Sequence, residues 1–141
     1  IADALKVNAS LTSLNLHRNS IHNEGAIAIA NALKVNFSLI TLNLHDNSIL
    51  REGVKAISDA LQENTSLTTM DLSKNGIGFH GFISIAKALT YNPSLLHLIV
   101  KYKRGSNPRF SGLQEFKNTF HNLQGVLNIL IGEDGAQVLG T

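Results

Sequence analysis

Two histidines and one aspartate are the residues whose types and spacing could support chemistry in this chain. His17 and His45 lie 28 residues apart in copies of one phrase, so they occupy equivalent positions in neighbouring units. On adjacent strands their Cβ atoms would lie about 5 Å apart, with Asp71 of the next copy nearby. Imidazole and carboxylate groups can bind zinc. However, Ser73 occupies the third equivalent position and repetition alone explains paired histidines, so we predict no metal site and favour a weak pH response of the stacked rings.

No other set of residues is suited to catalysis. The chain has no cysteine, which excludes disulfides, thiolate metal sites and a cysteine nucleophile. No nucleophile, base and acid are spaced as a set, and Gly76-Ile77-Gly78 lacks the third glycine of a phosphate-binding loop. We therefore predict a protein that is not an enzyme and carries no cofactor.

The composition is that of a folded chain without a strong charge. Of the 141 residues 43% are hydrophobic, enough for a continuous core, and 16% are charged, which argues against disorder. Twelve lysines and arginines against ten acidic residues leave a net charge of +2, which does not by itself indicate a nucleic-acid partner. No run of 18 or more apolar residues is present, so no membrane span is predicted.

A repeated phrase determines the expected fold. Residues 10–21 read Ser-Leu-Thr-Ser-Leu-Asn-Leu-His-Arg-Asn-Ser-Ile, and similar phrases return at 38–49 and 66–77. Such a period indicates a solenoid, because each unit has an apolar face that it can bury only against a copy of itself. Alternating leucines predict a short strand in each unit, and a 3–4 spacing of apolar residues predicts a helix after it. The helical segments are 25–36, 53–64 and 81–92.

Recurring asparagines and small residues are expected to hold this architecture together. The amides of Asn19, Asn47 and Asn75 should satisfy backbone groups in the turn after each strand. Glycines begin the helices where a side chain would crowd the preceding turn, alanines let each helix approach the sheet, and asparagines should end the helices as left-handed caps. These sets are Gly25, Gly53 and Gly81; Ala32, Ala60 and Ala88; and Asn36, Asn64 and Asn92. The N-glycosylation sequons that begin at Asn8, Asn36 and Asn64 are interpreted as products of the repetition.

The pattern Leu-x-x-Leu-x-Leu-x-x-Asn followed by a helix resembles the leucine-rich repeat of the ribonuclease-inhibitor type. The sequence around Glu-Gly-Ala and Ala-Leu-Lys-Val-Asn is most similar to the repeats of intracellular NOD-like receptors. The resemblance implies an α/β solenoid, a horseshoe with short parallel strands on the concave face and helices on the convex face. It covers residues 1–100 strongly and residues 101–130 weakly, and it is more specific for fold than for function.

The resemblance also implies a binding surface on the concave face. The polar residues that the motif exposes there are mixed in charge, which suits a hydrogen-bonded protein partner; a solvated face is the alternative. The candidate contacts are Asn15, His17, Arg18, Asn43, His45, Asp46, Asp71, Lys74 and His97.

The last third of the chain departs from the repeat. We divide the chain into regular repeats over 1–100, beginning within a helix, and an irregular or capping region over 101–141 that ends at the start of a further helix. A distorted strand is expected near 126–131, with Leu123 and Val126 in phase with Leu95 and Leu98. Both ends lack polar caps, so a fragment of a longer array that self-associates end to end is expected.

A basic stretch opens this irregular region. Lys101, Lys103, Arg104 and Arg109 have no acidic residue among them, and the turn residues beside them favour a solvated loop. An acidic protein is the second interpretation, and a nucleic acid or lipid is the weakest.

The predicted function is therefore a non-enzymatic protein-interaction module. The resemblance implies the ligand-sensing or autoregulatory region of a cytoplasmic receptor or scaffold, with innate immunity as one setting. The alternative is a regulator of a catalytic partner, similar to a ribonuclease inhibitor or a GTPase-activating array.

Overall fold

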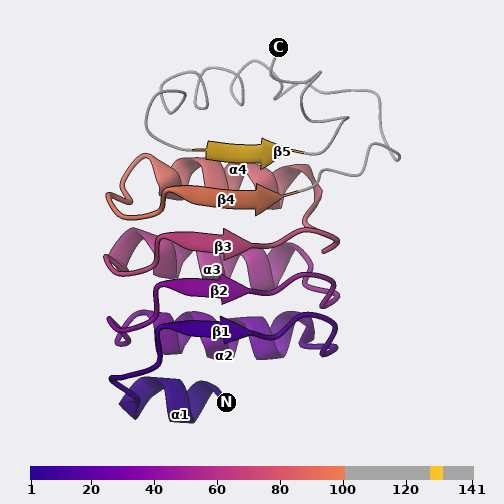
Figure 1. Ribbon diagram of the computed structural model, residues 1–141. Helices are drawn as coiled ribbons and strands as arrows, with labels where there is room; N and C mark the ends of the chain where they lie inside the picture. The colour runs from indigo at the N-terminus through magenta and orange to yellow at the C-terminus, as the bar shows by residue number, and fades with distance from the viewer. Residues whose placement is uncertain (101–127, 132–141) are drawn as a thin grey trace.

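The computed structural model describes residues 1–100 and 128–131, in which helices and parallel strands alternate. Within these residues four helices lie behind one five-stranded sheet, whose strands follow one another in chain order (Figure 1). The helices are α1 (Ala2–Val7), α2 (His22–Leu33), α3 (Arg51–Glu63) and α4 (Gly78–Leu89). The strands are β1 (Ser13–Asn15), β2 (Thr41–Asn43), β3 (Thr69–Asp71), β4 (His97–Val100) and β5 (Asn128–Ile131). The predicted basic loop and most of the irregular region lie outside the described residues.

The strands are in register at the predicted period. Leu14 lies opposite Leu42, which lies opposite Met70, which in turn lies opposite Leu98. This inward column and the helices behind it form one continuous core. The predicted α/β leucine-rich-repeat solenoid is confirmed, because each unit buries its apolar face against the next one.

The fifth strand lies where a strand was expected, but its register was predicted wrongly. Ile129, not Val126, lies opposite Leu98. The step from β4 to β5 is therefore 31 residues, three longer than the steps before it. Three extra residues between the strands move the residues of β5 out of the 28-residue phase.

The small residues in the helices pack as predicted, although each helix begins two or three residues before the glycine that was expected to start it. Ala32, Ala60 and Ala88 are fully buried. A Cβ atom added at Gly53 would lie 2.7 Å from Ile49 Cγ2 and 2.9 Å from Ala26 Cβ, closer than packed atoms approach. At this position glycine is needed for space rather than for backbone freedom.

The asparagines that follow the helices do not adopt the predicted left-handed conformation. Asn64 has φ −73° and ψ 128°, an extended backbone. Its buried side chain instead joins two units: Nδ2 donates to the carbonyls of Leu33 (2.8 Å) and Asn36 (2.9 Å), while Oδ1 accepts from the backbone of Ser66 and Leu67. Asn36 makes the same four bonds one unit earlier. We call these residues, with Asn92, the helix-end ladder.

The helix-end ladder also explains two of the sequons. The nitrogen to which a glycan would be attached is buried in Asn36 and Asn64 and donates two hydrogen bonds in each. A glycan on either nitrogen would displace those bonds and the packing around them. This agrees with the interpretation of the sequons as products of repetition.

A second ladder runs along the turns after the strands, as predicted. Asn47 is buried; its Nδ2 donates to Leu16 O (2.8 Å), and its Oδ1 accepts from Asn19 N (2.8 Å). Asn75 repeats these bonds to Leu44 and Asn47. This turn ladder links the successive loops that carry the predicted contacts. Among the described residues no helix is long and apolar enough to cross a membrane.

Candidate binding face

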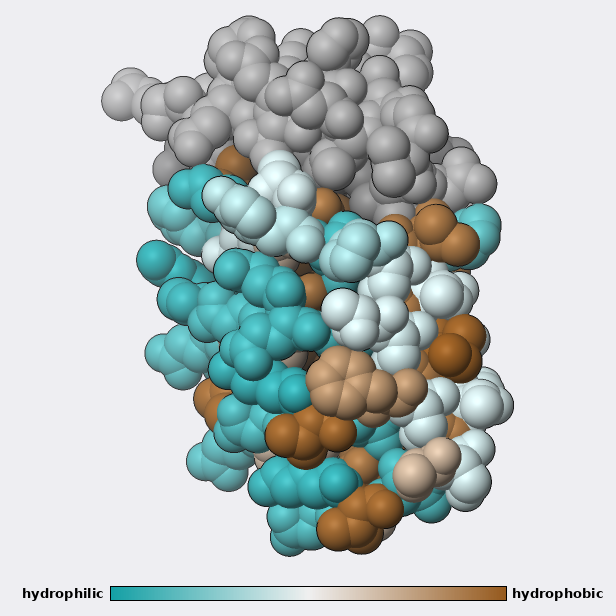
Figure 2. All heavy atoms as spheres, turned by 90° about the vertical axis from the view of Figure 1, so that its left-hand side faces the viewer, coloured by the Kyte–Doolittle hydropathy of each residue, from teal (hydrophilic) through white to brown (hydrophobic). Residues whose placement is uncertain are grey.

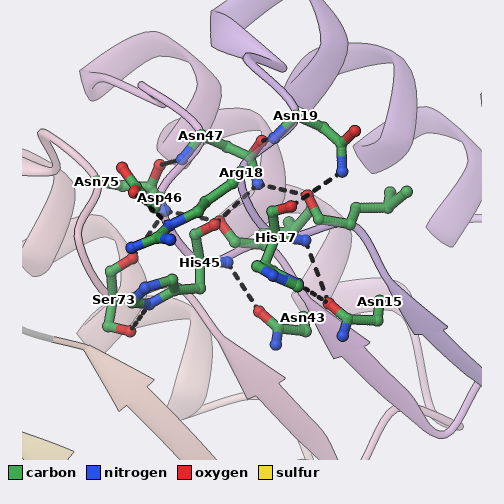
Figure 3. A network of polar contacts seen from close by, with 12 residues as sticks. Asn15, His17, Arg18, Asn19, Asn43, His45, Asp46, Asn47, Ser73 and Asn75 are labelled. Carbon is green, nitrogen blue, oxygen red and sulfur yellow. Dashed lines mark hydrogen bonds and ion pairs between the residues drawn. The ribbon is translucent and has the colours of Figure 1, made fainter.

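The predicted contacts lie on the side of the sheet opposite the helices, which we call the strand face. Strand pairing places Asn15, Asn43 and Asp71 in one row across three strands. The residues two and three positions later in each unit follow the same order across the units, because the strands are in register and the turn ladder links the turns. They form a histidine–serine row and a charged row (Figure 3). The rows are Asn15, Asn43 and Asp71; His17, His45 and Ser73; and Arg18, Asp46 and Lys74. All the predicted contacts in the three rows are exposed or half-buried, as is His97 on β4.

The first row is partly structural, which the sequence did not reveal. The Oδ1 atoms of Asn15, Asn43 and Asp71 each accept the backbone N–H two residues later, at 3.2, 2.9 and 2.8 Å. These bonds end each strand and turn the chain into its loop. The amide nitrogens of Asn15 and Asn43 and the second oxygen of Asp71 are left for a partner.

The charged row is held in an uncommon backbone conformation. Arg18, Asp46 and Lys74 have φ values of 55°, 56° and 54°, in the left-handed region that costs a non-glycine residue about 1–2 kcal/mol. The turn ladder and the bonds from Arg18 N to His45 O and from Asp46 N to Ser73 O hold this conformation. Conformations of this kind gather at functional sites, and here they display charged side chains at equal intervals.

Within this row two of the charges pair. Arg18 Nε lies 3.2 Å from Asp46 Oδ2, and the side chains are 65% and 43% exposed. An exposed pair of this kind contributes about 0–1 kcal/mol, so a partner could replace it at little cost. In the described part of the chain, the side chains of Lys74 and His97 make no hydrogen bond or ion pair.

His45 and Ser73 of the second row form a hydrogen-bonded chain with Asp71 of the first row, which the sequence did not predict. His45 Nδ1 lies 2.6 Å from Ser73 Oγ, which lies 2.5 Å from Asp71 Oδ1. An ionised carboxylate only accepts, so the serine proton points to Asp71 and the ring nitrogen must donate to Ser73. A serine nucleophile needs the opposite order, with its proton directed to the histidine. The buried Ser73 therefore orients His45 rather than attacking a substrate.

The same reasoning assigns the ring of His17. The atom of Asn15 that accepts the backbone N–H of His17 must be the carbonyl oxygen, and it lies 2.9 Å from His17 Nδ1. That nitrogen must therefore carry a proton. When neutral, both histidines therefore carry a lone pair on Nε2. This lone pair can accept a hydrogen bond, and it points away from the residue that is bonded to Nδ1.

This assignment can be tested directly. In long-range proton–nitrogen NMR spectra, at a pH that keeps the rings neutral, His17 and His45 should both show the Nδ1–H tautomer. The change Ser73→Ala should alter the His45 nitrogen signals and leave those of His17 unchanged. An Nε2–H tautomer for His45 would reverse the proton order and make Ser73 a candidate nucleophile again.

The described residues do not assemble a metal site. Within 1–100 and 128–131 no three histidine or acidic side chains are placed to hold one ion. His17 and His45 turn their Nδ1 atoms to different partners, Asn15 in the same unit and Ser73 in the next one.

A second exposed surface borders the strand face. Figure 2 views the side on which the chain passes from helices into strands, and apolar side chains stand there among polar ones. Phe37 is 56% exposed and Val35 57%. This apolar rim comprises Val7, Leu11, Val35, Phe37, Ile40, Tyr91 and Leu96. Exposed apolar groups of this kind can mark a contact surface, so the rim is the natural competitor of the strand face.

Comparison with known proteins agrees with this architecture. A model described as "Leucine Rich repeat" matches residues 7–30, 35–58 and 63–86, just over half of the chain. A solved structure of leiomodin-1 actin-binding site 2 is 27% identical, covers 88% of this chain and 72% of its own, and has a TM-score of 0.67. A Caenorhabditis elegans tropomodulin C-terminal domain is 11% identical over 99% of this chain and 86% of its own, with a TM-score of 0.78. The latter likeness concerns the fold alone. No curated protein matches the chain.

Proposed function

Because this chain belongs to the leucine-rich repeat family, and is a protein-interaction module of that family, we propose that its strand face binds a protein partner. One observation carries the proposal: three rows of polar side chains stand at equal intervals on the ends of the parallel strands and the turns after them, and most retain unused hydrogen-bonding groups. Side chains held in place before binding lose little conformational entropy on association, which favours affinity.

The most available groups lie toward β3 and β4. Lys74 and His97 are exposed and unpaired among the described residues. His45, oriented by Ser73, offers its Nε2 atom to a partner. Asp71 both supports Ser73 and retains a free oxygen, so its replacement would change the structure as well as any contact.

We further propose that the module belongs to a cytoplasmic receptor or scaffold, where it senses a ligand or regulates its own chain. The resemblance of its repeat phrase to the NOD-like receptors supports this assignment. The buried amide nitrogens of Asn36 and Asn64 add support, because neither sequon can carry a glycan in the folded chain. A regulator of a basic nuclease would need an acidic binding face. The strand face carries charges of both signs, so it supports this function less well than the receptor or scaffold.

Actin binding is a second candidate function. The leiomodin-1 structure that this chain resembles at 27% identity is described as an actin-binding site, and the likeness extends over 88% of the chain. An exposed face with separated positive and negative side chains suits a polar, charged surface of another protein.

A three-protein comparison tests both candidates. The wild type, the strand-face variant Lys74→Glu/His97→Ala and the rim variant Phe37→Ser are titrated with monomeric actin and sedimented with filaments. If actin is the partner, the strand-face variant should bind at least about tenfold more weakly, a loss of about 1.4 kcal/mol, while the rim variant binds as the wild type does. All three should have the same circular dichroism spectrum, because the replaced side chains are exposed.

The remaining outcomes are also decisive. If the wild type does not bind actin, the same three proteins are used to capture partners from the source cells, with quantification by mass spectrometry. A partner lost only with the strand-face variant supports the receptor or scaffold proposal. A partner lost only with Phe37→Ser would place the contact on the apolar rim and overturn it.

A further inference from the structure

The turn ladder contains a dipeptide with a reactivity that its copies lack. Asn75 is followed by Gly76, whereas the equivalent residues Asn19 and Asn47 are followed by serine. In an asparagine–glycine pair the glycine nitrogen can attack the side-chain carbonyl carbon of asparagine and expel ammonia. The resulting succinimide is opened by water to aspartate or isoaspartate. Glycine allows this attack most readily, because it has no Cβ atom and restricts the backbone least.

The fold engages the side chain of Asn75 in hydrogen bonds to other residues. Asn75 Nδ2 donates to Leu44 O (2.9 Å) and Leu72 O (3.0 Å), and its Oδ1 accepts from Asn47 N and Ile49 N, both at 3.0 Å. For the succinimide to form, the side chain must leave these partners and turn toward the nitrogen of Gly76. These four bonds, and a fifth of 3.4 Å from Nδ2 to Ser73 O, must break first, so the reaction requires local opening of the unit.

The product cannot restore these contacts. A carboxylate has no proton to donate, so an aspartate at this position would place negative charge beside the carbonyl oxygens of Leu44 and Leu72. Isoaspartate would also insert a methylene group into the backbone of a tight turn. Each product leaves part-buried groups unsatisfied between the second and third units.

We propose that Asn75 is a latent deamidation site that the turn ladder protects and that, once it reacts, keeps the second and third units from packing again. The reaction needs no enzyme and consumes only water. It lies next to Lys74, so it also adds a negative charge beside the strand face. The proposal does not depend on which partner that face binds.

The neighbouring unit supplies matched variants. Gly76→Ser gives the third unit the Asn-Ser pair of the other two; the added Cβ would meet only Leu50 Cδ2 closely, and Leu50 is a flexible side chain that is 51% exposed. Ser48→Gly creates a second Asn-Gly pair after Asn47, and the φ of 55° at Ser48 favours glycine there. The two variants thus remove the reactive pair from one ladder position and add it at another.

Peptide mapping measures the reaction. The wild type and both variants are incubated at mildly alkaline pH, folded or in urea, and digested with pepsin in acid, where further deamidation is slow. In urea Asn75 should convert ahead of Asn19 and Asn47 in the wild type, lose that lead in Gly76→Ser, and be joined by Asn47 in Ser48→Gly. In the folded wild type the conversion should be at least about tenfold slower, since each 1.4 kcal/mol of opening free energy gives tenfold protection. Equal folded and unfolded rates, or an Asn75 in urea no faster than Asn47, would overturn the proposal.

Refolding tests the consequence. Wild-type chains deamidated in urea are separated from intact ones, and both are returned to native buffer beside Gly76→Ser taken through the same incubation. The deamidated fraction should melt at a lower temperature than the intact one, and Gly76→Ser should refold unchanged. Identical melting of the deamidated and intact chains would show that the ladder tolerates the product.

Discussion

Replacing Asn64 with alanine should lower the free energy of unfolding by about 3 kcal/mol or more, the largest loss expected from any single polar residue of the described chain. Asn64 is fully buried and makes two donor and two acceptor bonds to backbone groups in three segments. Alanine would leave the carbonyls of Leu33 and Asn36 and the amides of Ser66 and Leu67 without partners. Each buried group left unsatisfied costs about 1–3 kcal/mol, reduced where water can enter.

Asn8 provides the matched control for this change. It occupies the equivalent position in the first unit, but it is exposed, and its Oδ1 accepts only from Ser10 and Leu11 of the same loop. Asn8→Ala should therefore cost less than about 1 kcal/mol. Urea unfolding followed by circular dichroism measures both values. Equal losses for Asn8→Ala and Asn64→Ala would mean that the bonds between units add no stability to those within a loop.

The main architecture could be predicted from the sequence because one period repeats. The leucines, alanines, glycines and asparagines recur at 28-residue intervals, and only one stacking places all of them in equivalent environments. The left-handed caps were predicted wrongly because the backbone preference of an isolated asparagine does not show that its side chain will bond to a residue one unit away. Asn64 is extended because its amide reaches back to Leu33 and Asn36.

The rows of the strand face could be predicted from the same period, but their internal bonds could not. Ser73 was interpreted only as the residue that takes the third position after two histidines, yet it connects His45 to Asp71. That link depends on side-chain rotation and on which atom carries a proton, and the spacing of residues encodes neither. The register of β5 was predicted wrongly for another reason. Three residues are added between β4 and β5, and the repeat motif is too degenerate there for the addition to be recognised in the sequence.

The cost of a cavity should depend on the unit in which it is made. Leu42 and Leu14 occupy the same register position on neighbouring strands. Leu42 is fully buried between Leu14 and Met70, whereas Leu14 lies on the edge strand β1 and is only partly buried. Leu42→Ala should therefore cost about 4 kcal/mol and Leu14→Ala about 2 kcal/mol, the upper and lower parts of the range for buried leucines.

The same unfolding experiment, made on both leucine variants, tests how the units share stability. In a solenoid each unit gains stability from its neighbours, so a defect inside the stack weakens two interfaces and a defect at its edge weakens one. Leu42→Ala should shift the whole transition to lower urea. Leu14→Ala should shift it by about half as much and should speed hydrogen exchange chiefly in α1 and β1. Equal losses would contradict this additivity and would indicate that β1 is covered in solution as fully as β2.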